Sequence, residues 1–407
     1  MQVNRGYRTE LKPNKNQVIG FKKARGAART AYNWGLERNN NVRLFNQLPH
    51  LPIRYESPID QHRLLNERKR RDWAWMYEVS KCAPQEALRD LGNAFHNFLK
   101  RPDHFGWPRF KSKHDDVQSF TLTGAIHIKK DSIQLPTFGE VRLKECGYLP
   151  VGHRVQSATV SSRAGRWFIS IGVRKRIKVP ENCGPVVGVD FGIKHLTALS
   201  DGTIIENGHP LGRTERRLER LQRSLSRKQK GSANRWKAKL RLQRLHMRIS
   251  DARKDGLHKL TTMLTRTKSV VVVEDLAVQN MTKRHSLAKA ILDGAPGEMR
   301  RQLEYKARWY GSRLVVAPRN FPSTKMCSRC HRVKEEMPLS ERIYECERCG
   351  LVIDRDLNAA KNLEWWYDHP TVAGSSPETL NACLRQEVAG PQGPVPVVDA
   401  GSVWRMS

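Results

Sequence analysis

Residues 184–196 read GPVVGVDFGIKHL, an almost unbroken apolar run that contains one carboxylate, Asp190. A short apolar run bounded by Gly and Pro predicts a buried strand. A second run of this kind, VVVVEDL at 270–276, carries Glu274 near its end. An unpaired buried carboxylate is costly, so such acids usually pair or bind a metal ion. Either acid alone is explained as a strand-end residue, but the shared pattern favours a common site.

A third acidic segment, IDRDLNAAKN at 353–362, opens a predicted helix. Asp354 occupies the position of a helix N-cap, which leaves Asp356 free to point toward the sheet. We therefore expect Asp356 to join Asp190 and Glu274. Mg²⁺ prefers hard oxygen ligands, and a pair of Mg²⁺ ions can clamp the attacking and leaving oxygens of a phosphodiester. The three acids predict metal-dependent phosphodiester hydrolysis.

The order of the acids also carries information. The sequence Asp, Glu, Asp, with separations of 84 and 82 residues, is the order found in a RuvC-like RNase H fold. A transposase of the DDE kind ends its triad with Glu, which argues against a strand-transfer enzyme. No Ser-His-Asp arrangement is legible, and the 14 histidines form no HExxH pattern.

Four of the eight cysteines form a C-x2-C, fifteen-residue, C-x2-C pattern. They are Cys327, Cys330, Cys346 and Cys349. Two short pairs can supply the four soft ligands of a tetrahedral Zn²⁺, and four cysteines leave no open position, so we expect one structural zinc. A redox pair or unligated thiols are the alternatives. The remaining cysteines are scattered and require no disulfide.

The composition indicates a polyanionic partner. Lys and Arg number 73 and Asp and Glu 40, a formal net charge of +33. The longest apolar runs, such as 270–273, are too short to span a membrane. The N-terminus MQVNRGYRTEL lacks the apolar segment of a signal peptide, so we expect a cytoplasmic protein.

Upstream of the acidic motifs, a helical part and a strand-rich part follow each other. Residues 3–11 alternate, which predicts a strand, and Asn14 is placed to cap the next helix. Helical spacing recurs at 59–76 and around 87–98. Residues 117–180 consist of short alternating segments between turns, typical of antiparallel strands. The opening strand is expected to return to this sheet and close a small barrel that holds the helices as an insert.

Residues 213–259 are strongly basic, with 17 Lys or Arg and four acids. Apolar residues recur at helical spacing before Gly231 and Ser232 (Leu218, Leu221, Leu225) and after them (Trp236, Leu240, Met247), which predicts a basic helical hairpin. A solvated charged face is the ordinary explanation, but the charge of the whole chain favours contact with a nucleic-acid backbone. After about residue 368 the chain is rich in Pro and Gly, which predicts disorder.

Taken together, these motifs resemble those of the TnpB family, compact RNA-guided DNA nucleases of bacterial insertion sequences related to type V CRISPR effectors. Four further segments are similar to family segments: LKPNKNQ (11–17), FGWPRFK (105–111), RKQKGSA (227–233) and RQLEYKARWYG (301–311). The resemblance covers nearly the whole chain before the predicted disordered tail.

The resemblance implies a multidomain α+β fold with a RuvC-like α/β nuclease domain. The implied parts are a wedge β-barrel (1–13 and 105–184), a helical recognition lobe (14–104), the RuvC domain (185–320 and 351–368), a zinc-ribbon insert that binds target nucleic acid (321–350) and a disordered tail (369–407).

The resemblance also implies roles for individual residues. Asp190, Glu274 and Asp356 would be catalytic and hold two Mg²⁺ ions, and residues 277–297 would form a lid over them. The sequence GAPG at 294–297 departs from the aromatic pair of many relatives.

Five residues are candidates for nucleic-acid contact by the same resemblance. Lys81 and Gln85 lie where relatives contact a duplex motif beside the target, although a solvated helix face explains them equally well. Arg227, Lys228 and Lys230 are expected to touch the backbone, which positions nucleic acid without reading its sequence.

The implied activity is RNA-guided, Mg²⁺-dependent cleavage of double-stranded target DNA by a single RuvC site. The partners would be a guide RNA from the transposon end and target DNA, and the particle a monomeric ribonucleoprotein in the bacterial cytoplasm, associated with the nucleoid and not with a membrane. Three alternatives stay open: a guide-directed repressor that does not cut, a compact type V CRISPR effector, and a zinc-stabilised RNA-binding protein.

Overall fold

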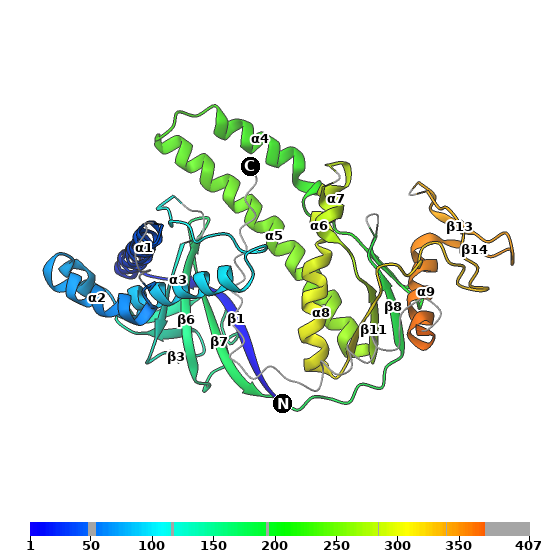
Figure 1. The fold of residues 1–407 in the computed structure, drawn as a ribbon, viewed down its shortest axis with the longest axis horizontal. Helices are drawn as coiled ribbons and strands as arrows, with labels where there is room; N and C mark the ends of the chain where they lie inside the picture. Colours follow the sequence, from blue (N-terminus) through cyan, green and yellow to red (C-terminus); the bar gives the residue numbers. More distant parts are fainter. Residues whose placement is uncertain (48–53, 115–117, 193–194, 284, 339, 371–407) are drawn as a thin grey trace. The chain divides into compact units, whose positions relative to one another are not determined.

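The computed structural model describes residues 1–47, 54–114, 118–192, 195–283, 285–338 and 340–370. The chain divides into two compact units, one at Gln2–Arg176 and one that begins at Ile177. Both units mix helices and strands (Figure 1). The tail predicted to be disordered lies outside the described residues from 371 onward. None of the described helices is long and apolar enough to cross a membrane.

A seven-stranded antiparallel sheet forms the base of the first unit. Its strands are β1 (Gln2–Lys12), β2 (Gln118–Thr123), β3 (His127–Ile128), β4 (Ser132–Leu135), β5 (Gly139–Leu143), β6 (Val155–Arg163) and β7 (Arg166–Arg176). The strand order is β2-β6-β7-β1-β5-β4-β3, so the opening strand returns to the sheet as predicted. No described pairing joins β2 to β3, and closure into a barrel stays a prediction.

Helices pack on this sheet as one body. They are α1 (Lys15–Phe45), α2 (Pro58–Arg71), the 3₁₀ helix η1 (Ala74–Glu78) and α3 (Cys82–Lys100). The predicted cap of α1 is confirmed: Asn14 Oδ1 accepts from Gln17 N at 2.9 Å, and Gln17 Oε1 accepts from Asn14 N at 3.0 Å. Phe21, Leu88 and Ile133 belong to one hydrophobic cluster. Helices and strands thus share a core, and their division into a wedge and a recognition lobe stays a prediction.

The second unit contains a five-stranded sheet whose central strands are the predicted apolar runs. Its strands are β8 (Val186–Asp190), β9 (His195–Leu199), β10 (Ile204–Glu206), β11 (Val270–Glu274) and β12 (Arg313–Ala317). Their order is β10-β9-β8-β11-β12. Strands β8, β11 and β12 are parallel, β9 is antiparallel to β8, and β10 is antiparallel to β9. Val187 and Val189 are buried with Val271 and Val273 in one core cluster. A central parallel strand covered on both faces has no polar face, which explains the unbroken apolar sequence.

Helices and a small hairpin complete this unit. They are the 3₁₀ helix η2 (Gly212–Thr214), α4 (Glu215–Ser226), α5 (Ala233–Thr267), α6 (Val278–Thr282), α7 (His285–Gly294), α8 (Pro296–Tyr310), β13 (Ile343–Glu345), β14 (Val352–Asp354) and α9 (Arg355–Asp368). The basic hairpin is confirmed as α4 and α5, which lie side by side (Figure 1). Gly231 has a φ of +86° in the turn, and Ser232 caps α5.

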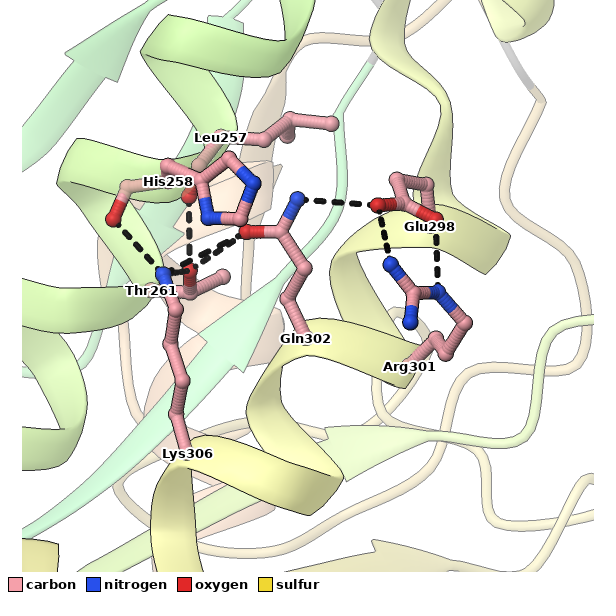
Figure 2. A network of polar contacts seen from close by, with 7 residues as sticks. All are labelled: Leu257, His258, Thr261, Glu298, Arg301, Gln302 and Lys306. Carbon is pink, nitrogen blue, oxygen red and sulfur yellow. Dashed lines mark hydrogen bonds and ion pairs between the residues drawn. The ribbon is translucent and has the colours of Figure 1, made fainter. Parts of the chain in front are cut away.

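Helices α5 and α8 are joined by a buried lysine. Lys306, 4% exposed, donates from Nζ to Thr261 Oγ1 at 2.7 Å, to Thr262 Oγ1 at 2.9 Å and to the carbonyl of His258 at 2.8 Å. Figure 2 shows Gln302 between Thr261 and Glu298 in the same network. Burial lowers the pKa of Lys306 to about 8. The three ammonium protons all have acceptors, so the lysine fixes the pairing of the two helices.

Helix α9 lies directly on the backbone of β8. A Cβ atom at Gly188 would stand 1.9 Å from the carbonyl oxygen of Ala360 and 2.7 Å from the amide nitrogen of Glu364. Residue 188 must therefore lack a side chain for this approach to occur. The contact sets the position of α9, which carries Asp356 in its first turn.

Replacing Gly188 with Ala should destabilise the second unit, because the methyl group would collide with the α9 backbone and force the helix away. Overpacking of this kind typically costs about 1–3 kcal/mol, measurable as a lower midpoint of urea unfolding. Gly256→Ala in α5 is the matched control, since nothing lies within 4 Å of its added Cβ. This second variant should be stabilised by about 0.5–1 kcal/mol through helix propensity. Equal midpoints for the two variants would contradict the backbone contact.

Candidate functional site

Asp190 and Glu274 occupy equivalent places at the ends of two neighbouring parallel strands. Val189 of β8 is paired with Val273 of β11, so the next residue of each strand is an acid at the carboxyl edge of the sheet. Both acids are partly buried. The sheet thus brings together two carboxylates that are far apart in sequence, as the sequence predicts.

Asp356 approaches the same edge from the first turn of α9. The predicted cap is confirmed: Asp354 Oδ1 accepts from the backbone N–H of Asp356 at 2.9 Å and of Leu357 at 3.1 Å. Asp356 is 8% exposed and points toward the loop that follows β8, because a Cβ at Gly192 would lie 3.3 Å from its Oδ2. The side chain of Asp356 is therefore available to the two strand-end acids.

Asp190 is close enough to the other two acids to feel their charges. Burial raises the pKa of Asp190 well above its ordinary value, and the charges of Glu274 and Asp356 raise it further. Burial also raises the pKa of Glu274, against the hydrogen bond that it accepts from Ser323. Within the described residues, the three do not form a set whose oxygens all lie within 4.8 Å of one another. The chemistry of the donor set suits divalent cations, because Mg²⁺ prefers oxygen ligands, but in this structure the three carboxylates stand too far apart to bind a single ion together.

The neighbouring Asp275 has a different environment. Its carboxylate accepts from Arg300 Nη1 at 2.6 Å and from Arg319 Nη2 at 2.7 Å. The hydrogen bond from Arg300 is the main reason why the pKa of Asp275 lies below its ordinary value. Asp275 is thus neutralised by two arginines, whereas among the described residues no Lys or Arg is paired with Glu274.

The four predicted zinc ligands converge. The four cysteine sulfurs all lie within 4.8 Å of one another, with Cys327 Sγ 3.6 Å from Cys349 Sγ and Cys330 Sγ 3.5 Å from Cys346 Sγ. A tetrahedron of Zn–S bonds of about 2.3 Å has edges of about 3.8 Å, so the cluster fits a zinc ion.

One thiol of this cluster is prepared for ionisation. Burial raises the pKa of Cys346, but backbone N–H groups of Cys349 and Arg348 and neighbouring thiols lower it to about 6. The hydrogen bond from the backbone N–H of Leu351 lowers the pKa of Cys349, but burial and hydrogen bonds to the neighbouring sulfurs outweigh it, so this pKa is raised instead. A bound cation would favour the ionised form of all four thiols.

The five residues predicted to contact nucleic acid are divided between the two units. In the first unit, Lys81 is exposed at the start of α3, and Gln85 follows one turn later with its N–H bonded to the carbonyl of Lys81 at 3.4 Å. In the second unit, Arg227, Lys228 and Lys230 form the turn between α4 and α5 (Figure 1). Within the second unit, none of Arg227, Lys228 and Lys230 touches the acids in any described contact. The roles of all five residues stay predictions.

Sequence reasoning missed three polar residues around the acids. Ser323 donates its hydroxyl to Glu274 Oε1. Asn358 and Asn362, both 0% exposed in α9, bind backbone atoms of residues 323–328, the segment around the first zinc ligand. Two asparagines four residues apart on the buried side of a helix are the signal that could have found them, since buried amides require partners.

Replacing Asp190 with Asn should stabilise the metal-free protein at neutral pH. In the folded state the raised pKa keeps a proton that the unfolded chain releases above about pH 3.9, so the free energy of unfolding of the wild type falls as pH rises. The variant lacks the titrating carboxyl group and so does not lose this stability. The difference between its urea midpoint and that of the wild type should therefore grow from pH 4 to 7 in EDTA. Added Mg²⁺ should narrow the difference by stabilising only the wild type.

Asp201→Asn is the control with the opposite sign. Burial raises the pKa of Asp201 less than hydrogen bonds from Lys268 and Thr203 lower it, so its charge is favourable in the folded protein. This substitution should destabilise at neutral pH, and an Asp190→Asn protein that behaves in the same way would refute the repulsion among the three acids.

Removing zinc should loosen the ribbon around the cysteine cluster. We expect one zinc per chain by elemental analysis, and loss of that zinc in Cys349→Ser with faster proteolysis between residues 321 and 354. Metal binding supplies on the order of 10 kcal/mol to small zinc domains. Cys183→Ser, at an exposed cysteine outside the cluster, should change neither quantity. A wild-type protein that resists chelation with unchanged stability would count against the metal site.

Three family models match the chain. The model described as "Probable transposase" matches residues 168–285, "Cas12f1-like, TNB domain" matches 297–363, and "Helix-turn-helix domain" matches 1–43. In the last range the structure has β1 and most of α1, a strand and one long helix.

Solved structures support the fold. The chain is similar to the protein in a structure titled "Cryo-EM structure of the Cas12f1-sgRNA-target DNA complex", with a TM-score of 0.52 and 13% identity over 86% of this chain and 82% of that one. At this identity the likeness concerns the fold alone.

Curated relatives match most of the chain. One from Streptomyces pristinaespiralis, named "Putative RNA-guided DNA endonuclease", is 39% identical over 89% of each chain. Another from Escherichia coli (strain K12), "Putative RNA-guided DNA endonuclease InsQ", is 31% identical over 89% of this chain and 92% of its own. These relatives are 39% and 31% identical over 89% of this chain, and the family models match its acidic and cysteine motifs. This chain belongs to the TnpB family.

Proposed function

We propose that this protein is an RNA-guided, Mg²⁺-dependent endonuclease that cuts double-stranded DNA at one RuvC-type site. The observation that carries the proposal is the arrangement of Asp190, Glu274 and Asp356 at one edge of the second sheet. The names of the curated relatives support RNA guidance and DNA as the substrate.

Asp190, Glu274 and Asp356 would hold the divalent ions. When bound, two Mg²⁺ ions supply an activated water and stabilise charge on the attacking and leaving oxygens. The protein contributes the positions of the ligands: strands β8 and β11 fix two of them, α9 fixes the third, and Ser323 orients Glu274 by its hydrogen bond. The valines of β8 and β11 that precede the two acids are buried in one hydrophobic cluster, which packs these strand ends into the core.

The other parts are assigned by the same proposal. Arg227, Lys228 and Lys230 contact the nucleic-acid backbone from the α4–α5 turn, while Lys81 and Gln85 read a short duplex motif, the Gln by a bidentate contact with adenine. The ribbon at 321–350 binds target nucleic acid, and α6 and α7 within 277–297 act as the lid. Base pairing with the guide reads the target sequence.

Asp190→Ala should remove cleavage while leaving binding. Loss of a metal-ligating carboxylate should lower the rate of cutting by more than about 100-fold, because even supporting residues of metal sites contribute 10- to 100-fold. The measurement is cleavage of a plasmid library by the protein purified with its own RNA, beside a gel-shift assay on the matched target. Asp201→Ala, outside the site, serves as control.

Three results of these experiments distinguish the nuclease from the alternative functions. Undiminished cutting by Asp190→Ala would refute the assignment of the site. Guide-dependent binding without cutting by the wild type in Mg²⁺ would favour a repressor. Sequencing the copurified RNA reveals whether the guide comes from a transposon end or from a CRISPR array.

A further inference from the structure

The cysteine cluster and the carboxylate site are linked through one face of α9. Asn358 and Asn362 lie one turn apart on this helix, and both are 0% exposed. Asn358 donates from Nδ2 to the carbonyl of Met326 at 2.7 Å and accepts at Oδ1 from the N–H of Ser328 at 2.9 Å. Met326 and Ser328 flank the zinc ligand Cys327. The helix that carries Asp356 is therefore bonded to both neighbours of a cysteine ligand.

Asn362 extends the connection toward the acids. Its Nδ2 donates to the carbonyls of Ser323 at 2.7 Å and Met326 at 2.6 Å. Ser323 is 2% exposed, and its hydroxyl donates to Glu274. A continuous series of buried hydrogen bonds thus runs from the cysteine turn through α9 and Ser323 to a carboxylate of the site.

The ribbon alone offers little to hold this series in place. Its buried apolar cluster consists of Tyr344 with Cys327 and Cys346. Three other ribbon side chains, Cys330, Met337 and Cys349, pack against it together with Leu351 and Ile353. A core this small depends on a metal ion for its order. Ser323 lies between Phe321 and Met326, which are buried in a core cluster with strand β11 and helix α9. Its position therefore depends on that core and, through the hydrogen bonds of Asn358 and Asn362, on the turn that carries Cys327.

A second contact docks the ribbon on the same helix. The ring of His331, next to Cys330, stacks on Trp365 with centroids 4.1 Å apart and an angle of 20° between the planes. Trp365 stacks in turn on His369 at 4.5 Å and 8°. The stack holds the ribbon against α9 without touching the acids, so it supports the hydrogen bonds but does not replace them.

We propose that Ser323, Asn358 and Asn362 are positioning residues that couple the zinc ribbon to the carboxylate site, so that zinc and the divalent cation bind cooperatively. The inference rests on the proposed function, because it takes the three acids as a metal site. The ribbon then has a second role besides any contact with nucleic acid: it sets the geometry of Glu274 and Asp356. Coupling between two sites is reciprocal, so each metal should tighten the other by the same factor, about 5- to 150-fold for typical coupling.

The test measures Mn²⁺ binding to the full chain, by electron paramagnetic resonance of the free ion, without any cleavage assay. Zinc-loaded Ser323→Ala should bind Mn²⁺ at least about 5-fold more weakly than the zinc-loaded wild type while keeping one zinc per chain and an unchanged circular dichroism spectrum. Ser323→Thr, which keeps the hydroxyl, should restore the affinity. Ser226→Ala, whose hydroxyl bonds to the carbonyl of Arg223 in α4, is the matched control. Asp190→Asn gives the background of binding outside the site.

The reciprocal arm measures zinc release to a chelator with and without Mn²⁺. Mn²⁺ should slow the release from the wild type and have little effect on Ser323→Ala. Equal Mn²⁺ affinity in the wild type, in zinc-depleted protein and in Ser323→Ala would overturn the coupling and leave the proposed function intact. No Mn²⁺ binding above the Asp190→Asn background in the zinc-loaded wild type would overturn both.

Discussion

The close contact between α9 and β8 is the constraint on which the second unit depends. At Gly188 the helix backbone lies where a side chain would otherwise stand, because a Cβ there would be 1.9 Å from the carbonyl oxygen of Ala360. This depth lets the first turn of α9 reach the ends of the central strands. Asp356 thereby meets Asp190, 166 residues earlier, and Glu274, 82 residues earlier. A single missing methyl group thus decides whether the last acid arrives at the site.

The resulting cluster of acids is unfavourable for the isolated fold. Asp190 and Glu274 have raised pKa values because burial disfavours their charged forms. Nearby acids are treated differently: Asp275 is bonded to Arg300 and Arg319. A protein that needed these strands only for stability could have placed apolar residues or ion pairs at both ends. Arg355, whose Nε lies 3.5 Å from Asp356 Oδ1, relieves this arrangement only in part, because the pKa of Asp190 stays well above its ordinary value. Buried acids with raised pKa values at one edge are typical of a functional site.

The ribbon illustrates how a small metal-bound insert can serve a larger domain. The ribbon lies between β12 and α9 in the sequence. Backbone groups of residues 323–328 bind the buried amides of Asn358 and Asn362. Asn358 binds on both sides of its amide and Asn362 donates twice from Nδ2, although Oδ1 of Asn362 has no described partner. These contacts tie the order of the ribbon to the position of the helix. The insert is therefore integrated with the sheet edge through α9.

The local sequence by itself predicts several strands, helix caps and the cysteine cluster of this protein. The apolar runs at 186–190 and 270–274, the caps Asn14 and Asp354 and the paired cysteines all depend on interactions between residues near each other in the chain. The structure has each of them where the pattern predicts it. What only the tertiary structure decided are the relations between distant segments. Parallel pairing of β8 with β11, the depth of α9 over Gly188 and the bond from Ser323 to Glu274 join residues that share no local pattern. Periodicity, capping and ligand spacing act over a few residues, whereas the distance between two acids on different elements depends on how whole helices and strands pack.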